Sequence, residues 1–238
     1  MGIDIIETRG SRLKEVRVND AHDRLVITDP SKNPVEHDIG LELLITAVFQ
    51  RKKSKTRKGD GNPLIYALKG LHHFSISEES KLALYEKMAT IVSNHYQGKK
   101  FDTVAPLPSS KPIALWLATT CCEILHVPIE KNAFFKATNA NVLNQLQGVN
   151  GGKEVIELRK LLEKAKPNGQ FAMKDVDYAQ RLHIEPISVN PFYSPAGKIL
   201  IVDDLVSSGS SLKSAYNSLK NKDPDLEIEC LALLGPVT

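Results

Sequence analysis

Residues 198–212 read KILIVDDLVSSGSSL, and the rest of the fold is organised around this stretch. It opens with four consecutive apolar residues, Ile199 to Val202, of which three are β-branched. A short apolar run of this kind predicts a strand that is buried on both faces, as in a parallel sheet. Small residues follow, and apolar residues then recur at helical spacing from Leu212 to Leu219. A strand, a short loop and a helix in this order are typical of an α/β protein.

Two carboxylates and a serine-rich loop stand where such a sheet binds its ligands. Asp203 and Asp204 end the predicted strand, and ligands of open α/β sheets bind outside the carboxyl ends of the strands. The loop from Ser207 to Ser211 runs into a helix N-terminus, whose backbone N–H groups favour a phosphate. Adjacent carboxylates can accept hydrogen bonds from a ribose or hold hydrated Mg²⁺. The pattern therefore favours a sugar phosphate, and the alternative is a solvated acidic turn.

Residues 202–211 resemble the phosphoribosyl-diphosphate (PRPP) binding motif of the type I phosphoribosyltransferases. In that motif an apolar strand leads to two acidic residues, two variable residues and a Thr/Ser-Thr/Ser-Gly loop, and Ser207 and Ser208 replace the commoner threonines. The resemblance implies that Asp203 and Asp204 orient the ribose and hold Mg²⁺ indirectly, through water or the ribose. It also implies a grip on the 5′-phosphate by the loop residues Ser207, Ser208, Gly209, Ser210 and Ser211.

A second strand and loop precede this motif in the chain. Residues 101–108 predict the first strand of the main sheet, and a helix is predicted over 113–125. Between them lie Ser109, Ser110 and Lys111, so the same physics predicts an anion site. In the phosphoribosyltransferases the corresponding loop holds pyrophosphate, and the resemblance assigns that role to these three residues. The alternative is a plain turn in which Ser110 caps the helix.

Further segments resemble one branch of the family, the ComF-like phosphoribosyltransferase-like proteins. The matching segments are 62–69, 104–110, 136–138 with Gln145, and 181–184. The arginines usual near the start of the lid in this branch are replaced by Lys136, which is a candidate catalytic residue, and the alternative is an exposed lysine. The resemblance implies an enzyme that uses Mg-PRPP and a nitrogenous acceptor, and that forms a homodimer.

The N-terminal part of the chain carries no such motif. Residues 1–33 predict short extended pieces, and a strongly apolar helix is predicted from Asn33-Pro34 to about Gln50. Six of the eight residues 51–58 are basic, which predicts a loop that contacts nucleic acid or polyphosphate, or one that is only solvated. We therefore divide the chain into an N-terminal extension, 1–61, and a phosphoribosyltransferase-like domain, 62–238.

The expected fold is α/β, a mostly parallel sheet flanked by helices, with a long insertion between core strands. Helices are predicted from Pro63, over 78–96 and over 153–166, and strands over 127–129, 186–189 and 226–234. The polar segment 139–184 interrupts the sheet, and such an insertion often forms a lid over an active site. A lid within 134–160 would exclude water from the site.

Composition indicates the class of protein and its cellular location. The chain has 238 residues, a net charge of +3 and 42% hydrophobic residues, which suffices for one sizeable core. No apolar run approaches the roughly 20 residues that span a membrane. The three cysteines, Cys121, Cys122 and Cys230, match neither a disulfide framework nor a zinc spacing, and reduced thiols predict a cytoplasmic protein.

Two functions of different classes remain open. The first is transfer of a phosphoribosyl group, and the second is a non-catalytic protein that senses PRPP or a nucleotide and acts on nucleic acid or a partner. The two functions differ in whether the protein has a pocket for the acceptor. Four aromatic residues could stack on a base there or belong to the core, and they are Phe134, Phe135, Phe192 and Tyr193.

Overall fold

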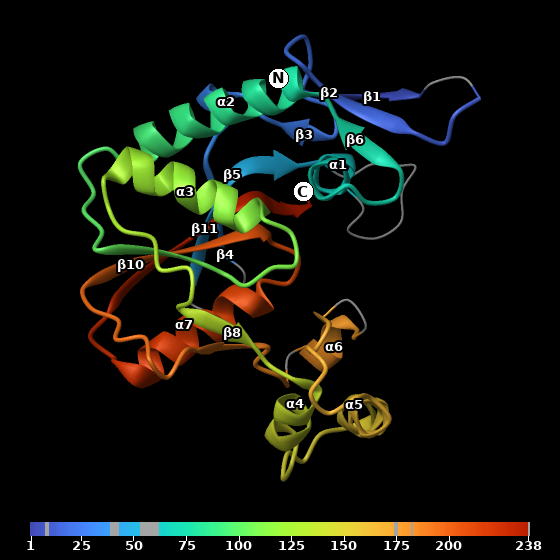
Figure 1. Cartoon of the computed structure of the whole chain (residues 1–238), viewed down its shortest axis with the longest axis vertical. Helices are drawn as coiled ribbons and strands as arrows, with labels where there is room; N and C mark the ends of the chain where they lie inside the picture. The colour runs from blue at the N-terminus through green and yellow to red at the C-terminus, as the bar shows by residue number, and fades with distance from the viewer. Residues whose placement is uncertain (8–9, 39–42, 53–61, 174–175, 182, 238) are drawn as a thin grey trace.

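A six-stranded sheet forms the centre of the molecule (Figure 1). The computed structural model describes residues 1–7, 10–38, 43–52, 62–173, 176–181 and 183–237. Four strands of the sheet are parallel and adjacent in the order β5 (Leu44–Arg51), β11 (Glu227–Val237), β10 (Lys198–Leu205) and β7 (Thr103–Pro106). Two short strands, β3 (Val26–Ile27) and β4 (Val35–Asp38), pair antiparallel with β5. The predicted α/β class is therefore confirmed, and the sheet is mixed.

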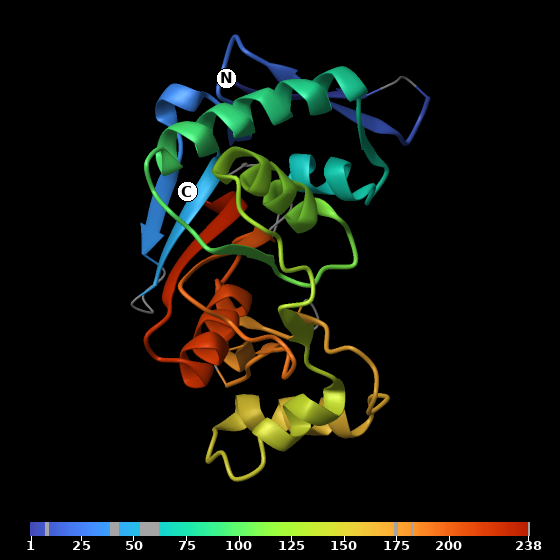
Figure 2. The ribbon, with the colours of Figure 1, turned by 60° about the vertical axis from the view of Figure 1, so that its left-hand side comes forward.

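Strand β10 lies between two layers of helices. Leu200 and Val202 belong to the core shared with α2 (Glu78–Tyr96) and α3 (Ile113–Leu125). Ile199 and Ile201 point to the opposite face and pack with α7 (Ser210–Lys222). Figure 2 shows these layers, with α2 and α3 on one side of the sheet and α7 on the other. Coverage of both faces explains why all four apolar residues of the opening run are fully buried.

The predicted helix from Asn33-Pro34 to Gln50 is wrong. A cis peptide bond joins Asn33 to Pro34, and β4 and β5 occupy the described part of this segment, whereas 39–42 lie outside the described residues. From Ile45 to Phe49 every residue of β5 is buried, because β11 and β4 flank the strand and core packs on both faces. A continuous apolar run is compatible with a buried helix or a buried strand, so local spacing could not separate the two.

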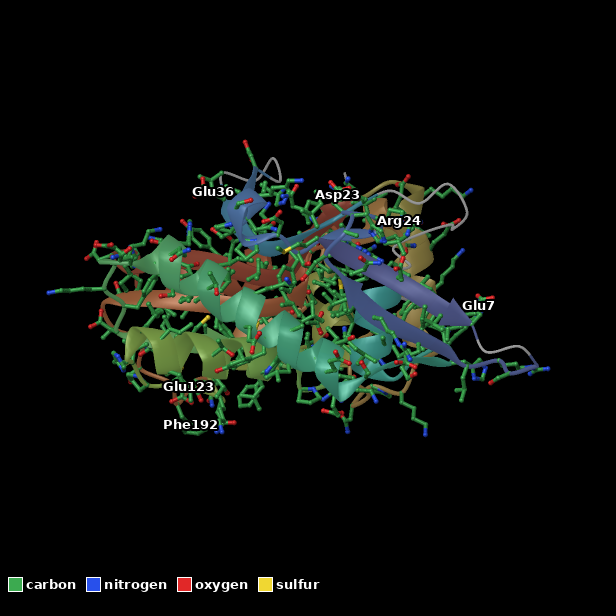
Figure 3. All side chains as sticks on the ribbon, turned by 90° about the horizontal axis from the view of Figure 1, so that it is seen from above. Glu7, Asp23, Arg24, Glu36, Glu123 and Phe192 are labelled. Carbon is green, nitrogen blue, oxygen red and sulfur yellow. The ribbon has the colours of Figure 1, made fainter. Side chains whose placement is uncertain are left out.

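The N-terminal residues form a smaller sheet beside α1 (Pro63–Lys69) and α2. Strands β1 (Gly2–Glu7), β2 (Lys14–Asn19) and β6 (Phe74–Ile76) pair in that order, which confirms the predicted extended pieces. Figure 3 looks down on this layer and shows Glu7 at the far end of β1 from Asp23 and Arg24. Strand β2 pairs with β6, and β5 pairs with β11, so the predicted segments 1–61 and 62–238 share both sheets.

Helix α1 (Pro63–Lys69) begins and ends on ordinary capping signals. The side chain of Asn62 accepts a hydrogen bond from the backbone N–H of Leu64, and Pro63 occupies the first turn. Gly70 ends the helix in the left-handed conformation, with φ 63°. These signals place Lys69, the last helical residue, next to the carboxyl edge of the main sheet through its contact with Asp204.

The insertion forms a lobe with a core of its own. Strands β8 (Phe134–Lys136) and β9 (Ile187–Val189) pair antiparallel at its root, and α4 (Asn139–Gln145), α5 (Lys153–Glu163) and α6 (Tyr178–Arg181) follow β8 (Figure 1). The predicted strand over 186–189 is confirmed, but it pairs with β8 and not within the main sheet. The predicted strand over 127–129 is reduced to a single bridge between Ile129 and Val104.

Within the part of the chain that the structure describes, no helix combines the length and apolar character needed to cross a membrane.

Candidate functional site

The acidic pair lies at the carboxyl end of β10, as predicted. Asp203 is half-buried and Asp204 is buried, and the backbone N–H of Asp204 donates to Asp203 Oδ1 at 2.8 Å. Desolvation, followed by the negative charge of Asp204, raises the pKa of Asp203 to about 7. The positive charges of Lys69 and Lys136 oppose this rise. The effect of Lys136, at the end of β8, is the smaller of the two, and no hydrogen bond or ion pair joins it to Asp203 or Asp204.

One member of the acidic pair, Asp204, forms an ion pair that the sequence did not predict. Lys69 Nζ lies 2.7 Å from Asp204 Oδ2, and both side chains are largely buried. Ser109 Oγ donates to the same oxygen at 3.4 Å, so the loop after β7 meets the acidic pair of β10. Lys69 belongs to a stretch that matches the ComF-like branch, but nothing in its local sequence indicates a partner 135 positions away.

The serine loop leads directly into α7. Gly209 occupies the N-cap with φ 73°, a left-handed conformation that favours glycine, and Ser208 Oγ lies 2.9 Å from Ser210 Oγ. The first backbone N–H groups of α7 have no acceptor within the helix, and groups of this kind can bind an anion, although that of Ser210 also lies 3.5 Å from Ser208 Oγ as a long hydrogen bond. A hollow of about 90 Å³ lies over the loop. It is lined by loop residues from Ser207 to Leu212, by Asp203 and Leu205, and by Met173 and Arg181 of the insertion.

A buried arginine forms hydrogen bonds with the backbone next to the serine loop. Arg51, at the end of β5, is 1% exposed; its Nε donates to the carbonyl of Gly235 at 2.5 Å and its Nη2 to the carbonyl of Val206 at 2.6 Å. The N–H of Val206 donates to the carbonyl of Leu234, so both backbone polar groups of the residue that precedes the loop are bonded. The prediction that 51–58 forms a solvent-facing basic loop is wrong for Arg51. Lys52 pairs with Asp23, and 53–58 lie outside the described residues.

The second predicted loop adjoins the first. Because β7 pairs with β10, Ser109, Ser110 and Lys111 lie at the same edge of the sheet as the acidic pair. These residues line an open pocket of about 290 Å³ together with Lys131, which belongs to no predicted motif. Pro112 occupies the N-cap of α3, so the alternative in which Ser110 caps this helix is wrong.

The four candidate aromatic residues do not converge on this edge. Phe134 is buried in the core beneath α7, and Tyr193 packs against that core. Phe135 is 48% exposed, and Phe192 is 93% exposed and lies at the rim of the molecule (Figure 3). Phe134 is therefore a core residue, and the structure gathers no aromatic surface from this set.

The oxygen atoms at this edge of the sheet meet the needs of Mg²⁺ only in part. Among the described residues, no three His, Cys, Asp or Glu side chains gather as a metal cluster. Asp203 and Asp204 supply carboxylate oxygens, and Lys69 and Ser109 already contact one of those of Asp204. Mg²⁺ is commonly held by one or two carboxylates together with substrate phosphates and water. The residues therefore fit the indirect mode, in which ligand and water complete the coordination.

Comparison with known proteins adds no relative: no protein-family model matches the chain, and no curated protein matches it.

Proposed function

We propose that the chain binds PRPP with Mg²⁺ at the carboxyl edge of the sheet, on a fold of the type I phosphoribosyltransferase kind. It would then transfer the phosphoribosyl group to a nitrogenous acceptor and release pyrophosphate. The observation that carries this proposal is the contact between Ser109 and Asp204. Through it, two strand–loop–helix units with anion-binding character meet at one acidic pair, which is the layout that a ligand with a phosphate at each end of a ribose requires.

Each part of the ligand has a matching part of the site. Asp203 and Asp204 accept hydrogen bonds from the ribose hydroxyls, and the loop 207–211 binds the 5′-phosphate. The loop 109–111 binds the pyrophosphate, where Lys111 offsets negative charge. Mg²⁺, when bound with the ligand, offsets further charge on the pyrophosphate.

In the reaction the C1–O bond to pyrophosphate breaks and the acceptor nitrogen forms a bond to C1 from the opposite face. Positive charge develops on the ribose ring as the bond breaks, and the carboxylates beside the ring stabilise it electrostatically. The chain otherwise contributes orientation, which makes the attack effectively unimolecular. Lys136 and the insertion would limit the access of water, so that PRPP is not hydrolysed.

Lys69 gives the acidic pair a partner before the ligand arrives. An unpaired buried carboxylate is costly, and the ion pair at 2.7 Å lowers that cost. A ribose over Asp204 would have to share or replace this contact. We therefore place Lys69 beside the bound ligand, where its ammonium group can turn towards the pyrophosphate.

A second candidate function is binding of PRPP or a nucleotide without transfer. The dispersed aromatic residues favour it, because Phe134 lies in the core and Phe192 points to solvent, so neither offers a shared surface for a base. In that case the same site would bind the ligand and the chain would act as a regulator.

The test is isothermal titration of the protein with PRPP and Mg²⁺, beside the double variant Asp203→Asn/Asp204→Asn. We expect binding by the unmodified protein and loss of binding in the variant. The control Glu86→Gln/Asp225→Asn changes charge equally at two exposed positions and should bind normally. Pyrophosphate release across nucleobases and amines then separates the candidates: release supports the enzyme, and binding without release supports the regulator. An unmodified protein that does not bind PRPP would contradict the enzyme, and one that binds neither PRPP nor a nucleotide would contradict both.

A further inference from the structure

The hollow over the serine loop is built from two parts of the chain. One part is the loop itself with the start of α7, and the other is the insertion, which contributes Met173 and Arg181. Pockets for whole drug-sized ligands hold roughly 300–1,000 Å³. At about 90 Å³ this hollow is much smaller, so it fits one group of a ligand and not the complete molecule. An arginine and a helix N-terminus facing the same small space both favour a phosphate.

Arg181 is held in place by the backbone of its own lobe. It is the last residue of α6, and its Nε donates to the carbonyl of Val176 at 3.1 Å. Val176 is buried in the core of the insertion. Asp177 and Gln180 bond each other's backbone N–H groups across the start of α6, which fixes the short turn. With Nε bonded to the protein, contact with a ligand falls to the two Nη groups of the guanidinium.

The insertion is fastened to the helix that carries the serine loop. Ser214 of α7 is buried, and its Oγ accepts from the N–H of Ile187 at 3.0 Å and donates to the carbonyl of the same residue at 2.6 Å. Ser218, one turn later, accepts from the N–H of Val189 at 2.8 Å. Strand β9 is thus bonded along α7, so the lobe that holds Arg181 and the loop that begins at Ser207 share one support.

We propose that Arg181 binds the phosphate that occupies the serine loop, so that the insertion completes the phosphate site. This inference rests on the proposed function, since it assigns a further residue to the same ligand. The planar guanidinium matches two oxygens of a phosphate monoester, whereas serine hydroxyls and backbone N–H groups supply single donors. The site therefore selects ligands with a terminal phosphate monoester, and it rejects ribose and nucleosides that lack one.

The test measures binding of three probes to the full chain: PRPP, ribose 5-phosphate and pyrophosphate, each with Mg²⁺. In Arg181→Gln we expect the affinity for PRPP and ribose 5-phosphate to fall by at least about tenfold, because one charge-assisted interaction is lost. The affinity for pyrophosphate should stay unchanged, because that probe binds at 109–111. Arg181→Lys keeps the charge and should recover part of the loss. Lys164→Gln removes a positive charge from an exposed position of the same lobe and should change none of the three affinities.

The outcomes separate this inference from the proposed function. Equal affinities of Arg181→Gln and the unmodified protein for PRPP and ribose 5-phosphate would overturn the role of Arg181 and leave the proposed function intact. A parallel loss for all three probes, together with a lower melting temperature, would show that Arg181 only supports the lobe, and would also overturn it. No binding of PRPP or ribose 5-phosphate by the unmodified protein would overturn both.

Discussion

Asp203 is placed at a cost to stability. Its carboxyl is half-buried beside Asp204, and the pKa is raised from 3.8 to about 7. Between these two values the folded chain binds a proton that the unfolded chain has released. The free energy of unfolding therefore falls as pH rises through this window and stays lower above it. Sites that bind charged ligands often carry such a cost, because the ligand supplies the missing compensation.

The variant Asp203→Asn should therefore be more stable than the unmodified protein at pH 8. Asparagine has the same shape and its Oδ1 can still accept from the N–H of Asp204. We expect a gain of up to about 4 kcal/mol at pH 8, because each pKa unit corresponds to about 1.4 kcal/mol, and this gain shrinks as pH falls below 7 and disappears near 4. Urea unfolding between pH 4 and 8 measures this. Asp225→Asn, at an exposed position, should show no such trend, and a pH-independent difference for Asp203→Asn would contradict the raised pKa.

Removal of Lys69 should act in the opposite direction. Lys69→Met leaves the buried carboxylate of Asp204 without its ion pair, and such a loss typically costs about 3–5 kcal/mol. We expect the free energy of unfolding to fall by this order at pH 7.5, measured by chemical denaturation. The double variant Lys69→Met/Asp204→Asn removes both charges and should recover most of the loss. If the single variant were as stable as the unmodified protein, the ion pair would not form in solution.

At the scale of elements, β5 and the serine loop depend on each other through Arg51. Arg51→Met would leave the carbonyls of Gly235 and Val206 without this donor, at about 1–3 kcal/mol for each buried acceptor. We expect a loss of roughly 2–6 kcal/mol in stability and faster amide exchange in the stretch that follows Val206. Hydrogen exchange read by mass spectrometry measures both. Exchange that rises evenly over the whole sheet would indicate general destabilisation and no particular role in the loop.

Local signals predicted some elements and not others. The four apolar residues from Ile199 predicted β10, and the helix predicted over 78–96 is α2, because the signals for both elements lie in neighbouring residues of the sequence. Strand β5 was missed, because its identity depends on pairing with β11 about 185 positions later. Arg51 was taken as one of a run of exposed charges, and only the fold shows that it turns inward.

The candidate site follows the same division. The acidic pair, the serine loop and the loop 109–111 were predicted from contiguous motifs, and the structure brings them to one edge of the sheet. Lys69, Lys131 and Arg181 were not assigned to the site, since each reaches it from a different element. The sequence around a single basic residue does not indicate its partner. Site residues of this kind can therefore be assigned only from the three-dimensional structure.

At the scale of the whole molecule, the lobe formed by the insertion has a core separate from that of the main sheet. Its core contains residues of the insertion alone, from Ala137 to Ile184. The main sheet completes its layers without it, through α2 and α3 on one face and α7 on the other (Figure 2). At the root, the N–H of Ala137 donates to the carbonyl of Pro186, one step beyond the pairing of β8 with β9. This is the geometry at which a two-residue hairpin turn can close two strands.

Replacement of residues 138–185 by an Asn-Gly turn should therefore leave a folded sheet with a weakened phosphate site. The hairpin of β8 and β9 stays bonded to α7 through Ser214 and Ser218, so we expect one cooperative thermal transition. Affinity for PRPP should fall at least as far as in Arg181→Gln, because Met173 and Arg181 leave the hollow together. Calorimetry and titration with PRPP measure the two effects.

A shortened chain that folds and binds PRPP with full affinity would show that the sheet alone forms the phosphate site. A chain that loses its cooperative transition would show instead that the lobe belongs to the core fold.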